Sequence, residues 1–150
     1  MDIQKNASFT VDHTKFGEGL YISRIDGDIT TYDMRTRRPN SGNYMDNIAM
    51  HTFEHMFSTY IRNSGLDVIY FGPMGCQTGF YLLVRNADND AVIAEIKSAC
   101  EKIKGHCGEV FGASEIECGN FKTLNLSAAK AEAEKYLDIL NKTKVNFKYF

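Results

Sequence analysis

Residues 51–62 of the sequence, HTFEHMFSTYIR, place two histidines and a glutamate in one short segment. An α-helix advances about 100° per residue, so His51, Glu54 and His55 would fall on one face of a helix. Two imidazoles one turn apart can bind a single cation, and the carboxylate between them can reach a metal-bound water or a substrate. The pattern H-x-x-E-H is the inverted form of the metallopeptidase zinc signature. These residues therefore predict a metal-binding helix that also carries an acid–base group.

Apolar residues recur at helical spacing in the same segment, which predicts that the rest of the helix packs into the core. They are Ala49, Phe53, Met56, Phe57, Tyr60 and Ile61. Asp46 is the expected N-cap, and Gly65 is the expected residue just past the end of the helix. Three fixed residues in five are a weak motif by themselves, so a solvated helix face with two histidines is the alternative interpretation.

A catalytic metal normally has three protein ligands and one open position, so the two histidines need a third donor. The candidates are Cys76, Cys100, Cys107, Cys118, His13, His106 and several carboxylates. Cys100 lies on an apolar helical stripe and is expected in the core, while His106 and Cys107 are expected in a surface turn. Cys76 and Cys118 each adjoin a glycine, which lets the backbone approach a ligand closely. Either can be the third ligand, and the other can stand over the open position as a base or acid.

The remaining pattern predicts strands that are separated and followed by helices. Strands are expected at Leu20–Arg24, Ile29–Arg35, Val68–Phe71 and Phe80–Val84, with a hairpin turn at Asp26-Gly27. Further helices are expected from near Asp90 to Gly105, and from Ser127 to about Asn141. This order predicts one α+β domain over residues 1–150, with a mainly antiparallel β-sheet packed against helices.

Composition narrows the function classes. The 150 residues are 43% hydrophobic and carry a net charge of −2, which fits one globular domain with its own core. No basic run is interleaved with aromatic residues, so nucleic-acid binding is not expected. No apolar run is long enough to span a bilayer, so we expect no membrane association, and no export signal is visible. The four cysteines are then expected to be reduced thiols.

Several landmarks spread along the chain carry a resemblance to a known family. They are Ser8-Phe9, Asp12-His13, Asp33-Met34-Arg35 before Pro39-Asn40, HTFEH with Arg62, PMGCQTG at residues 73–79 and the late Cys118-Gly119. PMGCQTG at this distance after HTFEH, followed by a late Cys-Gly, is very specific. On these residues the chain resembles the S-ribosylhomocysteine lyase (LuxS) family over nearly its whole length.

The resemblance implies a ligand set and a reaction. His51, His55 and Cys118 would bind one divalent metal per subunit, with Fe²⁺ expected and Zn²⁺ or Co²⁺ as alternatives. Glu54 and Cys76 would be the acid–base pair. The enzyme would convert S-ribosylhomocysteine to homocysteine and 4,5-dihydroxy-2,3-pentanedione by two carbonyl migrations and β-elimination of the thiol. The second product is the precursor of the autoinducer-2 quorum-sensing signal, and family members are cytoplasmic homodimers with sites at the subunit interface.

The resemblance also implies the contacts to the substrate. Ser8, His13 and Arg35 would bind the sugar hydroxyls, and Arg62 would hold the amino-acid end. Taken singly, the first three are better explained as a turn serine, a surface histidine and a strand-end arginine, while Arg62 fits an ordinary helix-terminal arginine nearly as well. The chain departs from the family at residues 70–72, Tyr-Phe-Gly, and at residues 124–126, Leu-Asn-Leu.

Two other functions fit parts of the pattern. An inverted-motif (HxxEH) zinc metallopeptidase would take a downstream glutamate as third ligand, and the available ones are Glu115, Glu117, Glu132 and Glu134. A metal-stabilised module without catalytic activity would instead close the fourth position with Cys76 beside Cys118.

Overall fold

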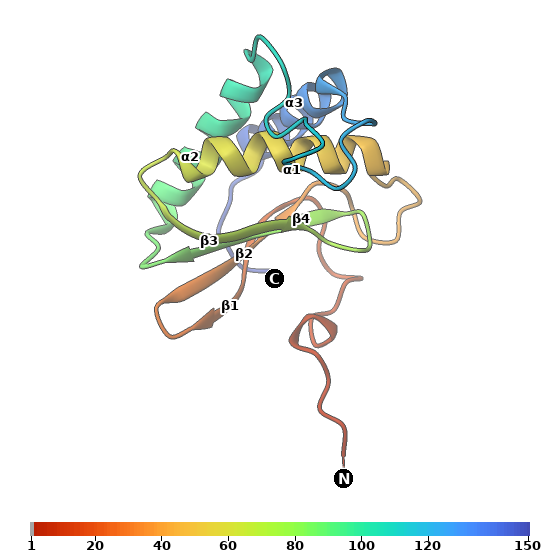
Figure 1. Cartoon of the computed structure of the whole chain (residues 1–150). Helices are drawn as coiled ribbons and strands as arrows, with labels where there is room; N and C mark the ends of the chain where they lie inside the picture. Colours follow the sequence, from red (N-terminus) through yellow and green to blue (C-terminus); the bar gives the residue numbers. More distant parts are fainter. Residues whose placement is uncertain (1) are drawn as a thin grey trace.

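The structure is a computed structural model that describes residues 2–150. This part of the chain contains four β-strands and three α-helices (Figure 1). The strands are β1 (Gly19–Asp26), β2 (Ile29–Arg35), β3 (Asp67–Pro73) and β4 (Gly79–Arg85). The helices are α1 (Asn47–Arg62), α2 (Asn89–Lys104) and α3 (Leu126–Lys142), with a short 3₁₀ turn η1 (Ala7–Phe9) before the sheet.

The strands form one sheet in the order β1-β2-β4-β3, and every neighbouring pair is antiparallel. In the first hairpin Asp26 pairs with Ile29, which leaves Gly27 and Asp28 as a two-residue loop. Gly27 has φ 60°, a left-handed conformation that glycine adopts without steric cost. The prediction of an α+β domain with an antiparallel sheet is confirmed, and so is the hairpin, although its loop is Gly27-Asp28 and not Asp26-Gly27.

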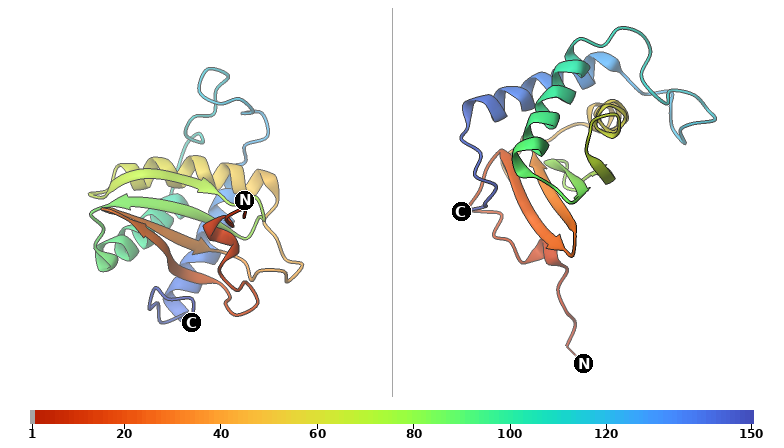
Figure 2. Two further views of the ribbon diagram at one scale, coloured as in Figure 1. Left: turned by 90° about the horizontal axis from the view of Figure 1, so that it is seen from below. Right: turned by 90° about the vertical axis from the view of Figure 1, so that its left-hand side faces the viewer.

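All three helices lie on one face of the sheet, and the N-terminal segment leaves from the opposite side (Figures 1 and 2). Alternate residues of each strand therefore face either the helices or the uncovered side. The core between the layers contains an aromatic cluster in which ring centroids lie 4.6–6.3 Å apart. Its members are Phe53, Phe57, Phe71 and Phe80, all at most 5% exposed. This cluster fixes α1, and hence its polar face, against β3 and β4.

The helix limits confirm one expectation and correct two. Helix α2 is capped by Asp88 and begins at Asn89, with Gly105 as its C-cap, so the limits expected from near Asp90 to Gly105 are confirmed. The Asp46 carboxylate accepts a hydrogen bond from the backbone N–H of Ala49, as an N-cap does, but α1 ends at Arg62 with Asn63 as its C-cap, so Gly65 lies further past the end than expected. Helix α3 is capped by Asn125 instead of Ser127.

The departure from the family at residues 124–126 has a structural role at this cap. The backbone N–H of Asn125 donates to the Thr52 hydroxyl at 3.0 Å, which ties the start of α3 to α1. Leu-Asn-Leu therefore forms the start of a helix in this chain, and Asn125 supplies its N-cap.

The residues that follow α2 differ from the expected surface turn. His106 is 9% exposed, and its Nδ1 lies 2.7 Å from the Tyr60 hydroxyl, while Nε2 lies 2.8 Å from the Glu109 carbonyl. His106 therefore anchors the segment after α2 to α1, whereas Cys107 is exposed as expected. Among residues 2–150, no helix is both long enough and apolar enough to cross a membrane.

Cys100 is fully buried in the core, as predicted, and this makes stability depend on pH. Burial raises the pKa of the thiol to about 12, from an ordinary value of 9.0. Above pH 9 the unfolded chain loses this proton while the folded chain retains it, so stability falls as pH rises toward 12. This thiol is expected to lower the free energy of unfolding by about 1 kcal/mol between roughly pH 8 and pH 10.

Denaturant titrations across this pH range test the effect. Cys100→Ala is expected to be less stable at neutral pH but to show a shallower decline with pH. Cys107→Ala, at an exposed cysteine, is the matched control and should keep the slope of the parent protein. Equal slopes for all three proteins would contradict the assignment.

Candidate metal centre

Helix α1 brings His51 and His55 together one turn apart on its partly exposed face. Their Nε2 atoms lie 3.1 Å apart, and the rings are almost perpendicular, with centroids 4.7 Å apart. Thr52 and Phe53, between the histidines and on the opposite side of the helix, are fully buried. The helix is therefore held by its buried side, which fixes the direction in which both imidazoles point.

A backbone carbonyl orients the ring of His55. Nδ1 of His55 lies 2.8 Å from the Phe111 carbonyl oxygen. Because a carbonyl oxygen can only accept, Nδ1 carries the hydrogen and Nε2 presents its lone pair toward His51. A carbonyl behind a ligating histidine is a common arrangement in metal sites, where it fixes the ring and its tautomer.

Gly112 permits this approach of the loop to His55. It has φ 70°, and a Cβ at this position would lie 3.0 Å from Nδ1 of His55. Gly112→Ala is therefore expected to lower the free energy of unfolding by about 1–2 kcal/mol through backbone strain. Displacement of the His55 ring should also weaken metal binding by about 10–100-fold.

The matched control for Gly112 lies in the same loop. Gly108 also has a positive φ, 108°, but nothing lies within 4 Å of a Cβ built there. Gly108→Ala should lose stability and keep metal affinity, as measured by competition with a chromophoric chelator. Equal metal affinity in the two variants would contradict the proposed role of Gly112.

Cys118 supplies the third donor from the segment between α2 and α3, which crosses α1 in Figure 1. Its Sγ lies 3.6 Å from Nε2 of His51, and the backbone N–H of Asn120 donates to this sulfur at 3.4 Å. The Cys118 N–H in turn donates to the Ser114 carbonyl at 3.0 Å, which fixes the turn. The Ser114 hydroxyl donates to the Glu117 carboxylate at 2.6 Å and accepts from the Glu117 backbone N–H at 3.3 Å, which also stabilises this turn.

The donor set fits a metal ion. One ligand atom each from His51, His55 and Cys118 lies within 4.8 Å of the others. Two imidazole nitrogens and a sulfur are the donors that zinc, iron(II) and cobalt(II) share. A cation between them would relieve the close approach of the His55 Nε2 lone pair to His51. Among residues 2–150 no further His, Cys, Asp or Glu belongs to this group, which leaves a coordination position for a small molecule.

A surface cleft of about 640 Å³ opens beside this group. Its walls include Glu54, His55 and Arg62 from α1, Tyr70 from β3 and Glu117 from the Cys118 segment. Glu54 is half-buried there, and Arg62 is exposed and donates to the Val68 carbonyl at 3.3 Å. Two of the predicted site residues, Glu54 and Arg62, thus share a cleft with His55, a candidate metal ligand.

Cys76 lies in the exposed turn between β3 and β4. Its Sγ lies 3.0 Å from the Thr78 hydroxyl and 3.9 Å from Nη1 of Arg35. Gln77 ties this turn to the start of α1, because its side chain donates to the Met45 carbonyl at 2.9 Å and its carbonyl accepts from the Met45 N–H. The turn is thus held near the end of α1 that carries His51, although no direct contact joins Cys76 to the three donors.

Arg35 is held rigidly at the end of β2. Its guanidinium binds the buried carboxylate of Asp33 through Nε and Nη2, and Nη1 donates to the Thr78 hydroxyl at 2.8 Å. Burial acts to lower the pKa of Arg35, but the Asp33 carboxylate outweighs it and the pKa is raised. Tyr149 donates to Asp33 at 2.8 Å, and burial, followed by the Asp33 charge, raises the pKa of this tyrosine.

The last two predicted contacts lie before the sheet. His13 is half-buried, with Nδ1 2.8 Å from the Val11 carbonyl and its ring 5.4 Å from that of Phe16. The guanidinium carbon of Arg35 lies 5.0 Å from the centroid of the Phe16 ring. His13 and Arg35 therefore flank the same ring. Ser8 hydrogen-bonds to the Asn6 side chain and lines a separate hollow with sheet residues of the side not covered by helices.

Several supporting residues were not identified from the sequence. The Phe111 carbonyl has no side-chain signature, and nothing in the sequence marks Gly112 as a neighbour of His55. Asp33 could have been predicted as the partner of Arg35, because residues two apart on a strand lie on the same face and these two have opposite charges. Thr78 was visible only as part of the PMGCQTG landmark.

The departure at residues 70–72 is a coupled change. A Cβ at Gly72 would lie 2.0 Å from the Tyr70 hydroxyl, so this tyrosine orientation requires a glycine two residues later. Tyr70 lines both the metal-side cleft and the hollow beside Ser8. The change therefore alters the wall of the cleft and leaves the metal donors in place.

Fold and site together define a small α+β domain with a His₂Cys group that could hold one metal ion beside an open cleft. A family model described as S-Ribosylhomocysteinase (LuxS) matches residues 6–147. The chain belongs to this family.

Curated relatives agree with this assignment over their whole length. Proteins named S-ribosylhomocysteine lyase from Borreliella afzelii, Finegoldia magna and Clostridium acetobutylicum are 43%, 41% and 38% identical to this chain. The alignments cover 98%, 95% and 97% of this chain and 99%, 95% and 99% of the relatives.

Proposed function

We propose that this protein is a carbon–sulfur lyase that cleaves S-ribosylhomocysteine to homocysteine and 4,5-dihydroxy-2,3-pentanedione. The observation that carries the proposal is the convergence of His51, His55 and Cys118 beside a cleft, in a chain that belongs to the S-ribosylhomocysteinase family. Residues 1–150 would act as one lyase domain.

One divalent metal ion per subunit would be held by His51, His55 and Cys118, with Fe²⁺ expected and Zn²⁺ or Co²⁺ as alternatives. When bound, the ion would supply Lewis acidity that makes C–H bonds next to a sugar carbonyl more acidic. The fixed tautomer of His55 and the N–H of Asn120 on the Cys118 sulfur support these ligand roles.

Glu54 and Cys76 would move the protons in both carbonyl migrations and in the β-elimination. Glu54 lines the cleft next to His55, where its carboxylate can exchange protons with substrate oxygens. Cys76 would exchange the carbon-bound proton as a thiolate, and such anions are stabilised by adjacent cations. Arg35, which Asp33 and Thr78 hold in place, is the cation within reach of its sulfur.

The substrate would be bound at both ends. Arg62 can pair with the carboxylate of the homocysteine end because it lines the same cleft as Glu54. Ser8, His13 and Arg35 would bind the sugar hydroxyls. These three belong to a second group, which surrounds Phe16 and the uncovered side of the sheet.

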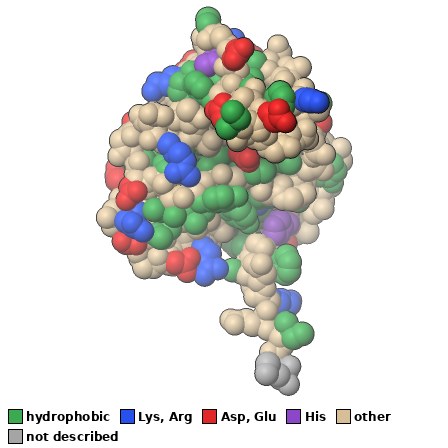
Figure 3. Space-filling view, viewed as in Figure 1, with side chains coloured by type: hydrophobic (Ala, Val, Ile, Leu, Met, Phe, Trp, Pro, Cys, Tyr) green, Lys and Arg blue, Asp and Glu red, His purple; other side chains and the backbone are tan. Residues whose placement is uncertain are grey.

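A homodimer with its sites at the interface would explain why the site residues fall into two groups. A second copy could bring the Ser8, His13 and Arg35 group of one subunit to the cleft of the other. The uncovered face of the sheet offers an apolar surface, where Tyr70 is 52% exposed and Tyr81 and Leu83 line the hollow beside Ser8. Hydrophobic side chains form a band at the level of the sheet in Figure 3.

We place this enzyme in the cytoplasm, in methionine-cycle recycling and autoinducer synthesis.

The donor set favours the lyase over both alternatives. A peptidase would need a glutamate ligand, but Glu132 pairs with Arg37. The other three candidates are exposed and outside the donor group, namely Glu115, Glu117 and Glu134. A closed four-ligand site would need Cys76 beside Cys118, whereas Cys76 contacts Thr78 and Arg35.

Thiol release tests the proposed activity directly. Protein purified anaerobically and loaded with Fe²⁺ is incubated with S-ribosylhomocysteine, and free thiol is titrated over time. We expect one equivalent of homocysteine per substrate consumed and no release from S-adenosylhomocysteine. Absence of thiol at full metal occupancy would overturn the proposal.

A further inference from the structure

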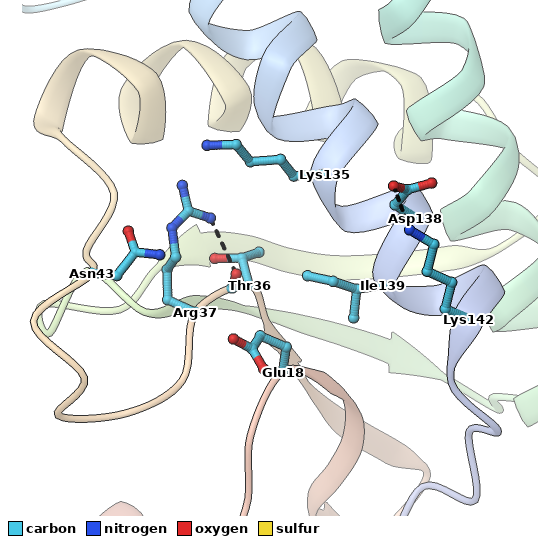
Figure 4. Close-up of a pocket in the computed structure, with 8 residues that line it drawn as sticks. All are labelled: Glu18, Thr36, Arg37, Asn43, Lys135, Asp138, Ile139 and Lys142. Carbon is cyan, nitrogen blue, oxygen red and sulfur yellow. Dashed lines mark hydrogen bonds and ion pairs between the residues drawn. The ribbon is translucent and has the colours of Figure 1, made fainter.

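We propose that a second cavity, between the end of β2 and helix α3, binds a small carboxylate ligand at Arg37. The cavity has a volume of about 290 Å³. Thr36 and Arg37 form its floor, and Ile139 and Lys135 from α3 form its wall (Figure 4). It shares no lining residue with the metal-side cleft, so its ligand is distinct from the substrate of the proposed lyase.

Arg37 carries a buried hydrogen-bond donor that has no acceptor. Nη1 and Nη2 bind both carboxylate oxygens of Glu132, at 3.0 and 2.5 Å, and Nη1 also donates to the Thr36 carbonyl at 3.1 Å. The two side chains are each 7% exposed. Nε is nevertheless buried without a hydrogen-bond partner, the one such side-chain atom among residues 2–150. A buried donor left unpaired is costly, so a ligand oxygen that Nε reaches after a small movement of the Arg37 side chain would bind with a gain.

The surrounding side chains define the charge of that acceptor. Figure 4 shows Lys135 reaching over the cavity on the Arg37 side and Asn43 flanking Arg37. Lys135 has no salt bridge to any residue in the described part of the chain, whereas Lys142 is paired with Asp138 at 3.1 Å. One free ammonium and one free guanidinium N–H suit a single negative charge.

Two further features favour a carboxylate over a phosphate. Glu18 lies at the lower rim in Figure 4 and Asp138 lies beside Lys142, and both would repel a dianion more strongly than a monoanion. Ile139 provides an apolar wall for a short hydrocarbon substituent. The Thr36 hydroxyl donates to the Thr78 carbonyl or to the Met45 sulfur, so it is already used within the protein. The site therefore fits a small monocarboxylate with a short apolar tail.

NMR titration of the full-length protein tests this site, with acetate as the probe and chloride used to hold ionic strength constant. Arginine Nε–Hε signals are resolved from the backbone in a ¹⁵N–¹H spectrum, and Arg37→Lys assigns the signal of Arg37. We expect a saturable shift of this signal in the millimolar range. Lys135→Ala should weaken acetate binding by about two- to fivefold, because an exposed charge contributes modestly.

Matched variants and a second anion keep the proposal falsifiable. Lys102→Ala on α2 removes another exposed helix lysine and should leave acetate binding unchanged. Lys135→Gln repeats the test should the alanine variant misfold, as its backbone spectrum would reveal. No saturable shift at Arg37, an equal shift with chloride alone, or unchanged affinity in both Lys135 variants would overturn the site. Tighter binding of phosphate than of acetate would overturn its assignment to a monocarboxylate.

Discussion

Cys118→Ala is expected to remove the bound metal and to lower the rate of thiol release by about 10³-fold or more. The sulfur is one of three donors, and the remaining two histidines would leave a weak bidentate site. Lewis-acid stabilisation is worth several kcal/mol, and each 1.36 kcal/mol corresponds to a tenfold change in rate. Metal content is measured by plasma spectrometry after dialysis, together with the thiol-release assay.

Cys107→Ala is the matched control for Cys118. Cys107 lies on the same segment between α2 and α3, but it is exposed and its thiol contacts only the Gly105 carbonyl at 3.7 Å. This variant should retain both metal and activity. A Cys118→Ala protein that still held one equivalent of metal would show that the third ligand is another residue, as the peptidase interpretation requires.

Glu54→Gln is expected to lower the turnover number by about 10²–10⁴-fold, which is the usual contribution of a positioned proton-transfer group. The amide keeps the size of the side chain and its place in the cleft but cannot exchange protons near neutral pH. Metal content should stay at one equivalent, because Glu54 is outside the donor group. Steady-state thiol release and metal analysis on the same preparation measure both quantities.

Glu117→Gln provides the comparison for Glu54. Glu117 lines the same cleft but accepts a hydrogen bond from the Ser114 hydroxyl at 2.6 Å, so it supports the turn that precedes Cys118. We expect at most a small change in turnover for this variant. An equal decrease in turnover number for both variants would mean that neutralising either glutamate impairs the cleft, which would contradict a specific role of Glu54.

The metal helix could be predicted because its information is local. The spacing of His51 and His55 places both on one face of a helix, and the apolar stripe that includes Phe53 places the opposite face in the core. The third ligand could not be derived in the same way. Cys118 meets His51 across 67 residues, and such a contact depends on how a loop folds back, so Cys76 remained equally plausible until family landmarks were compared.

The exact ends of the helices could not be predicted for a different reason. Asn125 and Ser127 are both good N-cap residues, as are Asp88 and Asp90, so local preference does not choose between them. At α3 a tertiary contact favours Asn125, whose N–H is bound by Thr52 of α1. His106 was misjudged for a similar reason, because its partner Tyr60 lies on another helix.

The groups that hold Arg35 in place are synthesised at very different times. Asp33 holds Arg35, but the Tyr149 hydroxyl that binds Asp33 comes 116 residues later in the chain. A ribosome making this protein therefore exposes the acidic partner long before its phenolic donor. Until Tyr149 emerges, the nascent chain must keep Asp33 and Arg35 hydrated or paired with each other alone, and the environment of Cys76 reaches its final form only after Tyr149 has left the ribosome.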